Sequence, residues 1–299
     1  MGSHRILALL ELAEECPTQD ELAEFLADPD PDVRKTALSV LSEATEDWSL
    51  ASPVFAAALA DPDPSVRTAA IELLRELREV LVPVPEFGAA LRDRAIHGDP
   101  PVRVAAVGAL WRHRLSSVAE LAERLADPAA EVRGEAVLGL VSLDALDVLA
   151  RAVVDQRAEV RLAVARGIAT VGDPRGTATL IVLAGDADPL VRAEALTAMA
   201  RTGCTEAAAR LATAALADPA WQVREGAAIA LGAADPGEAA DALVVASRDP
   251  NLDVRKAAVR ALGGWLPARP ELRAALESAE RDADADVRAY ARMSLHPNH

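Results

Sequence analysis

The sequence has few aromatic residues, and this shortage bears on its fold class. Aromatic residues make up 3% of the 299 positions, and the runs of β-branched and aromatic residues that are typical of strands are missing. Apolar residues make up 51% and are mainly Ala, Leu and Val, which suit closely packed helices. The composition therefore favours an all-helical chain.

Basic residues are scarce and scattered, which excludes several kinds of partner. The formal net charge is −16, and Lys35 and Lys256 are the only lysines. Nucleic-acid-binding proteins need clustered Lys and Arg to displace counterions from phosphates, and anionic membrane surfaces attract polybasic segments. No segment of this chain is a basic block. We therefore expect neither a nucleic acid nor a membrane surface as the partner.

Long hydrophobic runs are also missing. No apolar run approaches the roughly 18 residues that a membrane-spanning helix needs. The N-terminal apolar stretch contains Glu11, Glu14 and Glu15, which the core of a signal peptide would lack. We therefore expect a cytoplasmic protein.

Residues suited to metal binding or catalysis are sparse. Cys16 and Cys204 lie 188 positions apart and match no metal or redox spacing. No two histidines have the helical spacing of metal ligands, and His296 and His299 lie at the chain end, where a frayed terminus is expected. There is no glycine-rich phosphate loop, and no carboxylate stands out as a general acid or base. The sequence therefore predicts no catalytic residue, no metal and no cofactor.

Repetition is the strongest positive feature. The segment DPDPDVRKTA at residues 28–37 returns as DPDPSVRTAA at residues 61–70, and the dipeptide Val-Arg recurs in nine such segments at intervals of 28 to 36 residues. This period fits two helices of about three turns each and two short turns. The sequence therefore predicts about nine repeats of a two-helix unit.

An aspartate precedes the repeated arginine by six residues in eight of the nine repeats, and the third repeat has Asp99 only four residues before Arg103. We expect this aspartate in the tight turn between the two helices, where its carboxylate accepts backbone N–H groups or faces an arginine at the start of the next helix. The eight pairs are Asp28/Arg34, Asp61/Arg67, Asp127/Arg133, Asp155/Arg161, Asp186/Arg192, Asp218/Arg224, Asp249/Arg255 and Asp282/Arg288.

Apolar residues surround each repeated arginine at helical spacing. The residue before it is always Val, the third residue after it is Ala or Val, and the seventh is Leu, Ile or Met. These positions form one stripe on a helix. A single repeat cannot bury such a stripe, so neighbouring repeats must stack. We predict an all-α fold, an α-solenoid of about nine stacked two-helix repeats.

With these residues the chain resembles the HEAT repeats, and more closely the short HEAT-like repeats of phycobilin lyase subunits. The resemblance covers residues 17–295, with a capping helix over residues 4–16 and a tail over residues 296–299, and we expect residues 1–299 to form a single α-solenoid domain. It implies that the Asp/Arg pairs form a structural ladder that links successive repeats. Unlike the longer HEAT pattern, this sequence has no recurrent proline inside the first helix.

Two HEAT-like families with a known chemistry do not fit. Deoxyhypusine hydroxylase holds its metals with His-Glu motifs, and this chain contains no His-Glu dipeptide. HEAT-like DNA glycosylases offer DNA a cationic concave surface, which an acidic chain with two lysines is poorly placed to supply. The resemblance therefore implies a fold more than an activity.

A candidate binding groove follows from the helix geometry. If the apolar stripe faces the core, the residues one, five and eight positions after each arginine point the opposite way, into the concave side. These positions are polar in the first two repeats, largely apolar in the middle repeats, and charged again in the eighth. The predicted partner-binding residues are Val104, Trp111, Leu138, Val141, Leu162, Arg166, Ile229, Lys256 and Arg260.

Two functions fit such a groove. The first is a non-catalytic scaffold or adaptor that holds a helix or extended peptide of a partner protein, with Arg166 or Arg260 meeting an acidic group. The second is a small-molecule or chromophore-handling protein with an apolar pocket around Trp111. A third interpretation is purely structural: the apolar positions pack against each other in a tightly curved superhelix. We favour the adaptor, whose interface should be long and shallow, whereas a ligand site should be a closed pocket of a few hundred Å³.

Overall fold

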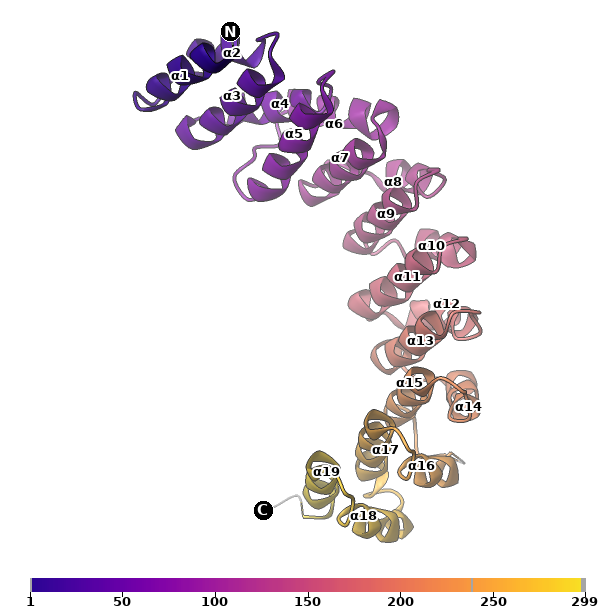
Figure 1. Ribbon diagram of the computed structural model, residues 1–299. Coiled ribbons are helices and arrows are strands. Elements are labelled where there is room, and N and C mark those ends of the chain that lie inside the picture. The colour runs from indigo at the N-terminus through magenta and orange to yellow at the C-terminus, as the bar shows by residue number, and fades with distance from the viewer. Residues whose placement is uncertain (1, 238, 297–299) are drawn as a thin grey trace. The chain divides into compact units, whose positions relative to one another are not determined.

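The computed structural model describes residues 2–237 and 239–296, and every regular element in these ranges is a helix (Figure 1). The chain divides into two compact units, residues 1–142 and residues 143–299, and each is described by itself. The prediction of an all-α fold is confirmed.

The first unit is a double layer of helices. Its helices are α1 (Gly2–Ala13), α2 (Gln19–Leu26), α3 (Pro31–Ala44), α4 (Trp48–Ala58), α5 (Pro64–Glu76), α6 (Pro85–His97), α7 (Pro100–Arg112), α8 (Val118–Arg124) and α9 (Ala130–Ser142). The second helices α3, α5, α7 and α9 contact one another in succession, and the first helices α2, α4, α6 and α8 each pack on the second helix that follows (Figure 1). The helix α1 packs on α3, as a preceding second helix would.

The second unit repeats this arrangement. Its elements are α10 (Leu146–Leu149), η1 (Ala150–Val154), α11 (Ala158–Val171), η2 (Pro174–Gly176), α12 (Thr177–Leu183), α13 (Pro189–Thr202), α14 (Glu206–Ala215), α15 (Trp221–Gly232), α16 (Ala240–Ala246), α17 (Leu252–Trp265), η3 (Pro270–Leu272), α18 (Arg273–Ala279) and α19 (Ala285–Leu295), where η marks a 3-10 helix. The second helices α11, α13, α15, α17 and α19 contact one another in succession. The predicted α-solenoid of two-helix repeats is therefore confirmed, and the extent of the array as one domain stays a prediction.

Aspartates, in several repeats together with prolines, shape the turn before the second helix. In α3, the N-terminal cap is Asp30, whose Oδ1 accepts the backbone N–H of Asp32 at 3.0 Å, and Pro31 is the first helical residue. Proline suits this position because its fixed φ is helical and the N–H that it lacks would have no partner in the helix. The carboxylate of Asp28 accepts the N–H of Asp30 at 2.8 Å and closes the turn.

The core is the apolar stripe that the sequence predicts. The Val before the repeated arginine, the third residue after it and the seventh residue after it are buried in all nine repeats. The small third residue lets adjacent second helices approach closely, and the larger seventh residue fills the space between them. Burial of this stripe is the main force that stacks the repeats.

The helix α9 contains two glycines in contrasting surroundings. A Cβ atom at Gly139 would lie 2.9 Å from both Cδ atoms of Leu121 in α8 and 3.1 Å from Cβ of Trp111 in α7. A Cβ atom at Gly134 would meet nothing within 4 Å. The close packing of α9 on α7 and α8 therefore requires a glycine at position 139 but not at position 134.

Candidate binding face on the second helices

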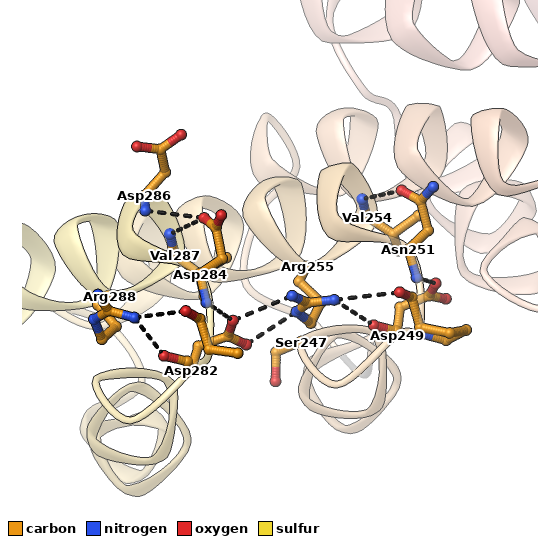
Figure 2. Close-up of polar contacts among 12 residues, drawn as sticks. Ser247, Asp249, Asn251, Val254, Arg255, Asp282, Asp284, Asp286, Val287 and Arg288 are labelled. Carbon is orange, nitrogen blue, oxygen red and sulfur yellow. Dashed lines mark hydrogen bonds and ion pairs between the residues drawn. The ribbon is translucent and has the colours of Figure 1, made fainter.

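The repeated arginines and aspartates lie at the turns and join one repeat to the next. Figure 2 shows one joint, in which Arg255 of α17 donates from Nε to Oδ2 of Asp282 at 2.9 Å and from Nη2 to Oδ1 at 3.2 Å. The Nη1 of the same arginine donates to the backbone carbonyl of Asp249, six residues earlier, at 3.1 Å. This arginine thus holds its own turn through the backbone and the following repeat through a side-chain ion pair.

The same geometry recurs in both units. In these joints the carboxylate that faces the arginine belongs to the next repeat, whereas the residue five or six positions earlier contributes its carbonyl. Further side-chain pairs of this kind are Arg34–Asp61, Arg67–Asp99 and Arg103–Asp127 in the first unit, and Arg161–Asp186, Arg192–Asp218 and Arg224–Asp249 in the second. In the last repeat, Arg288 donates to the carbonyl of Asp282 at 2.8 Å.

Arg133 of α9 shows how the observed joints differ from the pairs read from the sequence. The six-residue spacing pairs Arg133 with Asp127, but Nη1 of Arg133 donates to the backbone carbonyls of Asp127 at 2.9 Å and of Pro128 at 3.2 Å. The Asp127 carboxylate instead faces Arg103 of the preceding repeat, with 2.7 Å between Oδ1 and Nη2. The predicted pairing is corrected accordingly. The arginine binds the backbone carbonyl of the aspartate six residues before it, whereas the carboxylate of that aspartate binds the arginine of the preceding repeat.

Two further residues of these joints do not follow the six-residue spacing. Nε of Arg5 in α1 lies 2.5 Å from Oδ2 of Asp28, and the residue Asp28 is only 5% exposed. The helix α1 therefore supplies the arginine that pairs with the aspartate of the first repeat. Asp99 accepts from Nε of Arg67 at 3.1 Å and also caps α7 by accepting the N–H of Val102 at 3.1 Å. Because Asp99 combines two roles that other repeats divide between two residues, the third repeat has a shorter turn.

The pKa values of two carboxyl groups in these joints, Asp127 and Asp186, are lowered by hydrogen bonds. Hydrogen bonds from Arg161 are the largest effect on Asp186 and hold its pKa below the ordinary value, against the opposing effect of burial. Burial is the largest effect on Asp127 and by itself would raise the pKa, but hydrogen bonds from Arg103 and from the N–H of Ala129 bring it below the ordinary value. These carboxyl groups are therefore ionised at neutral pH and form ion pairs with the arginines of the preceding repeats.

The face formed by the second helices of the first unit contains a cavity of about 280 Å³. The cavity lies between α5, α7 and α9, and its floor is apolar while its walls carry charge. It is lined by Leu74, Arg75, Arg78, Val104, Ala105, Ala109, Arg112, His113 and Glu135. Of the predicted groove residues, Val104 belongs to this lining.

A cluster around Glu135 forms one wall of this cavity. Oε1 of Glu135 accepts the indole N–H of Trp111 at 2.9 Å and lies 2.9 Å from Nη1 of Arg112. The guanidinium of Arg112 also lies over the Trp111 ring, 4.4 Å from its centroid, in a cation–π contact. A Cβ atom at Gly108 would lie 2.3 Å from Nη1 of Arg112 and 2.8 Å from Oε1 of Glu135, so this glycine gives the cluster its space.

His113 forms the C-terminal cap of α7 at the edge of the cavity. Its ring packs edge-on against Phe87, with 5.4 Å between the ring centroids. Burial is the main cause that lowers the pKa of His113, and the charge of Arg112 lowers it further, while Glu79 acts in the opposite direction. The imidazole is therefore neutral at pH 7, and the positive charge of the cavity comes from its arginines.

Two other predicted groove residues of the first unit lie on α9. Leu138 is 44% exposed, and Val141 is half-buried. Trp111 is half-buried as well, and its indole N–H is bonded to Glu135. Leu138 is thus the most exposed of the predicted apolar residues of the first unit. The surroundings of Val104 contain more charged side chains than the sequence predicts.

The second unit brings two predicted residues together. Ile229 of α15 and Arg260 of α17 line a cavity of about 290 Å³, with the small residues Ala228, Gly232, Ala233, Ala257 and Ala261. Arg260 is exposed, and its guanidinium lies 5.5 Å from the centroid of the Tyr290 ring. The cavity is therefore lined by small and apolar residues and one cation.

The remaining predicted residues of the second unit are only partly free. Leu162 of α11 is half-buried. The side chain of Arg166 is 63% exposed and forms an ion pair with Glu194 at 3.1 Å, and Lys256 forms one with Asp286 at 2.9 Å. Neither Leu162 nor Arg166 lines the cavity around Ile229.

Metal binding, thiol chemistry and membrane insertion can each be examined among the described residues. No group of three His, Cys, Asp or Glu residues in residues 2–237 and 239–296 could hold a metal ion. Cys16 is exposed, and burial raises the pKa of the Cys204 thiol, which disfavours the reactive thiolate. In the described ranges, every helix is too short or too polar to cross a bilayer. The histidine pair at the C-terminus includes His299, which lies outside the described residues.

Comparisons with known proteins agree on the repeat. A family model described as HEAT repeats matches residues 3–75, 19–95, 145–231 and 210–296. No curated protein matches the sequence.

Three solved structures are similar to this chain. The crystal structure of an engineered protein is 20% identical, covers 97% of this chain and 94% of its own, and has a TM-score of 0.60. Importin β, crystallised in an ammonium sulfate condition, is 14% identical with a TM-score of 0.65, and a mutant of Kap121p is 14% identical with a TM-score of 0.56. The matches cover 92% and 97% of this chain but only 44% of the importin β chain and 38% of the Kap121p chain. At these identities the likeness shows the fold alone.

Proposed function

Because the chain belongs to the HEAT-repeat family, we propose that it is a non-catalytic scaffold whose second helices bind a peptide or a helix of a partner protein. The observation that carries the proposal is the exposure of Leu138 on a second helix, beside a face that also presents Trp111 and Val104. Exposed apolar side chains that adjoin recessed sites are typical anchors for a partner.

The two cavities on the second helices support a peptide partner. Each holds about 280 to 290 Å³ and is lined by both apolar and charged side chains. Pockets for small molecules usually hold about 300 to 1,000 Å³ and enclose most of the ligand. Cavities at or below the lower limit suit single side chains of a longer, extended ligand.

The alternative function, a chromophore or small-molecule pocket around Trp111, has less support. The indole N–H of Trp111 is already bonded to Glu135, and the cavity beside it carries three arginines and a glutamate next to its apolar residues. The narrower resemblance to phycobilin lyase subunits and the cytoplasmic location stay predictions from the sequence.

A library of random 16-residue peptides, selected on the immobilised full-length chain, tests the proposal. Selected peptides are then measured by fluorescence anisotropy against Leu138→Asp and Leu162→Asp. A leucine buried at an interface contributes about 1.5 to 3 kcal/mol, so we expect each substitution to weaken by tenfold or more those peptides that contact its own unit.

The matched control is Leu50→Asp, because Leu50 is 60% exposed and lies on the first helix α4. We expect this variant to bind every selected peptide as the unmodified chain does. Circular dichroism checks that all three variants retain their helix content. Equal binding by Leu138→Asp, Leu162→Asp and the unmodified chain would refute the proposal.

A further inference from the structure

We propose that the cavity between α5, α7 and α9 binds an acidic side chain of the partner, an inference that rests on the proposed function. The cavity presents three arginines, Arg75, Arg78 and Arg112, and one carboxylate, that of Glu135. This local excess of positive charge stands out in a chain whose formal net charge is −16. An anionic group is the ligand that such a cavity attracts.

The three arginines carry more N–H donors than their present contacts use. In the part of the chain that the structure describes, the exposed guanidinium of Arg75 has no hydrogen bond and no ion pair. Arg78 pairs with Glu79 at 3.0 Å, but both side chains are more than half exposed, so the pair is weak and easily exchanged. Arg112 uses one nitrogen for Glu135, and a guanidinium carries five N–H donors.

The floor of the cavity adds a second requirement. Leu74, Ala105 and Ala109 are each less than 9% exposed and form an apolar base with Val104 beside the arginines. An occupant that satisfies both regions has methylene or methyl groups close to its charge. A glutamate or aspartate next to an apolar residue meets this requirement, because it places a carboxylate on the wall and carbon atoms on the floor.

The charge balance favours a carboxylate over a phosphate. Glu135 lines the cavity and Glu79 lies next to Arg78, so three guanidinium groups face two carboxylates. This balance accommodates one added negative charge, whereas a phosphoserine brings about two. The cavity therefore fits a monoanionic side chain.

The net charge of the whole chain and the local charge of the cavity act on a partner at different distances. The net charge of −16 attracts a basic segment over distances up to a Debye length of about 8 to 10 Å. The cationic cavity then accepts an acidic side chain of that segment at contact distance. A basic segment with a single acidic anchor beside an apolar residue is thus bound in one register, because any other register places a cation against the arginines.

The test uses the peptides selected on the full-length chain and a double variant, Arg75→Gln with Arg78→Gln. In peptides that lose affinity for Leu138→Asp, we expect a shared Asp or Glu whose change to Asn or Gln weakens binding about tenfold, because hydrogen bonds to a charged group contribute about 1.5 kcal/mol or more. The double variant should weaken the same peptides to a similar degree. The double variant should bind the peptide that lacks its acidic residue little more weakly than either change alone predicts, since both changes remove the same interaction.

A matched control removes two arginines elsewhere. Arg151→Gln with Arg210→Gln changes the net charge equally but on η1 and α14 of the second unit, so it should leave these affinities unchanged. Raising NaCl from about 50 to about 500 mM should weaken the binding of peptides that carry the acidic anchor more for the unmodified chain than for the Arg75/Arg78 variant.

The outcomes separate this inference from the proposed function. Peptides that depend on Leu138 but tolerate loss of their acidic residue would overturn the acidic anchor and leave the scaffold standing. Tighter binding by a peptide with phosphoserine in place of the acid would overturn the carboxylate assignment. A library that yields no peptide dependent on the second helices would overturn the scaffold and this inference together.

Discussion

The joint between α11 and α13 offers a measurable test of what links the repeats. Arg161 donates from Nε to Asp186 Oδ2 at 2.6 Å and from Nη2 to Oδ1 at 2.7 Å. The side chains are only 14% and 8% exposed, and the same carboxylate accepts the N–H of Asp188 at 2.8 Å. Asp186→Ala removes all three acceptor contacts and leaves Arg161 with the carbonyl of Asp155.

The expected loss follows from burial. Removing one partner of a buried ion pair costs about 3 to 5 kcal/mol, against about 0 to 1 kcal/mol for an exposed pair. Because the pair is slightly accessible, we expect Asp186→Ala to lower the free energy of unfolding by about 3 kcal/mol. The double variant Asp186→Leu with Arg161→Met should recover part of this loss, since it leaves no unpaired charge.

Urea unfolding followed by circular dichroism measures the loss, and hydrogen exchange with mass spectrometry locates it. Exchange should rise in α11 and α13 before other helices of the second unit, because each repeat is stabilised by its neighbours. The control is Glu206→Ala, which removes an ion pair with Arg210 whose side chains are 86% and 70% exposed. If Asp186→Ala lowers the unfolding free energy no more than this control does, the ion pairs do not hold the repeats together.

Three further predictions concern packing, the cavity and pH. Gly134→Ala should stabilise the chain by about 0.5 to 1 kcal/mol in thermal or urea unfolding, whereas Gly139→Ala in the same helix should destabilise it by about 1 to 3 kcal/mol, because only the second added methyl group meets close neighbours. Gly108→Ala displaces the ends of two flexible side chains, so it should leave the unfolding free energy unchanged or higher but weaken the binding of peptides that carry the acidic anchor several-fold in anisotropy titrations. The pKa values of Asp127 and Asp186 are lowered in the folded state, so their stabilisation should be complete above the unfolded value of about 3.9 and should disappear as the pH falls through the folded values; unfolding midpoints measured from about pH 6 to about pH 2 that stay constant would contradict this sign.

The fold could be predicted from the sequence because its determinants are local and repeated. The Val, Ala and Leu positions around each arginine have helical spacing, and each is buried in the structure. An aspartate in each turn, joined by a proline at the start of helices such as α3, α5 and α13, fixes where one helix ends and the next begins. Nine copies of the same pattern exclude accidental agreement, and stacking follows because a single repeat exposes its apolar stripe.

The partner of each arginine could not be deduced from the six-residue spacing. An arginine at that position reaches two acceptors, the carbonyl of its own turn and the carboxylate of the next turn, as Arg255 does with Asp249 and Asp282 (Figure 2). The sequence carries the same aspartate in both turns, so it does not indicate which group of each aspartate is bound. Distances between repeats, which only the fold supplies, decide the question.

The charged cavity was missed because long side chains extend beyond the helix position that bears them. Helical spacing gives the direction of Cβ, and the columns one and eight positions after the repeated arginine contain Val104 and Arg75, which both line the cavity. Arg112 and Glu135 stand next to the expected columns, but their ends reach the cavity through the space left by Gly108. A glycine within an otherwise regular second helix was the available signal.

The most direct test of the binding face is photo-crosslinking with a selected peptide that carries benzophenone next to its acidic residue. After irradiation, the attachment site on the full-length chain is mapped by mass spectrometry. The proposal predicts attachment to α5, α7 or α9, at or next to residues that line the cavity with Arg75 and Arg112. Attachment to the first helices α4, α6 or α8 would contradict it.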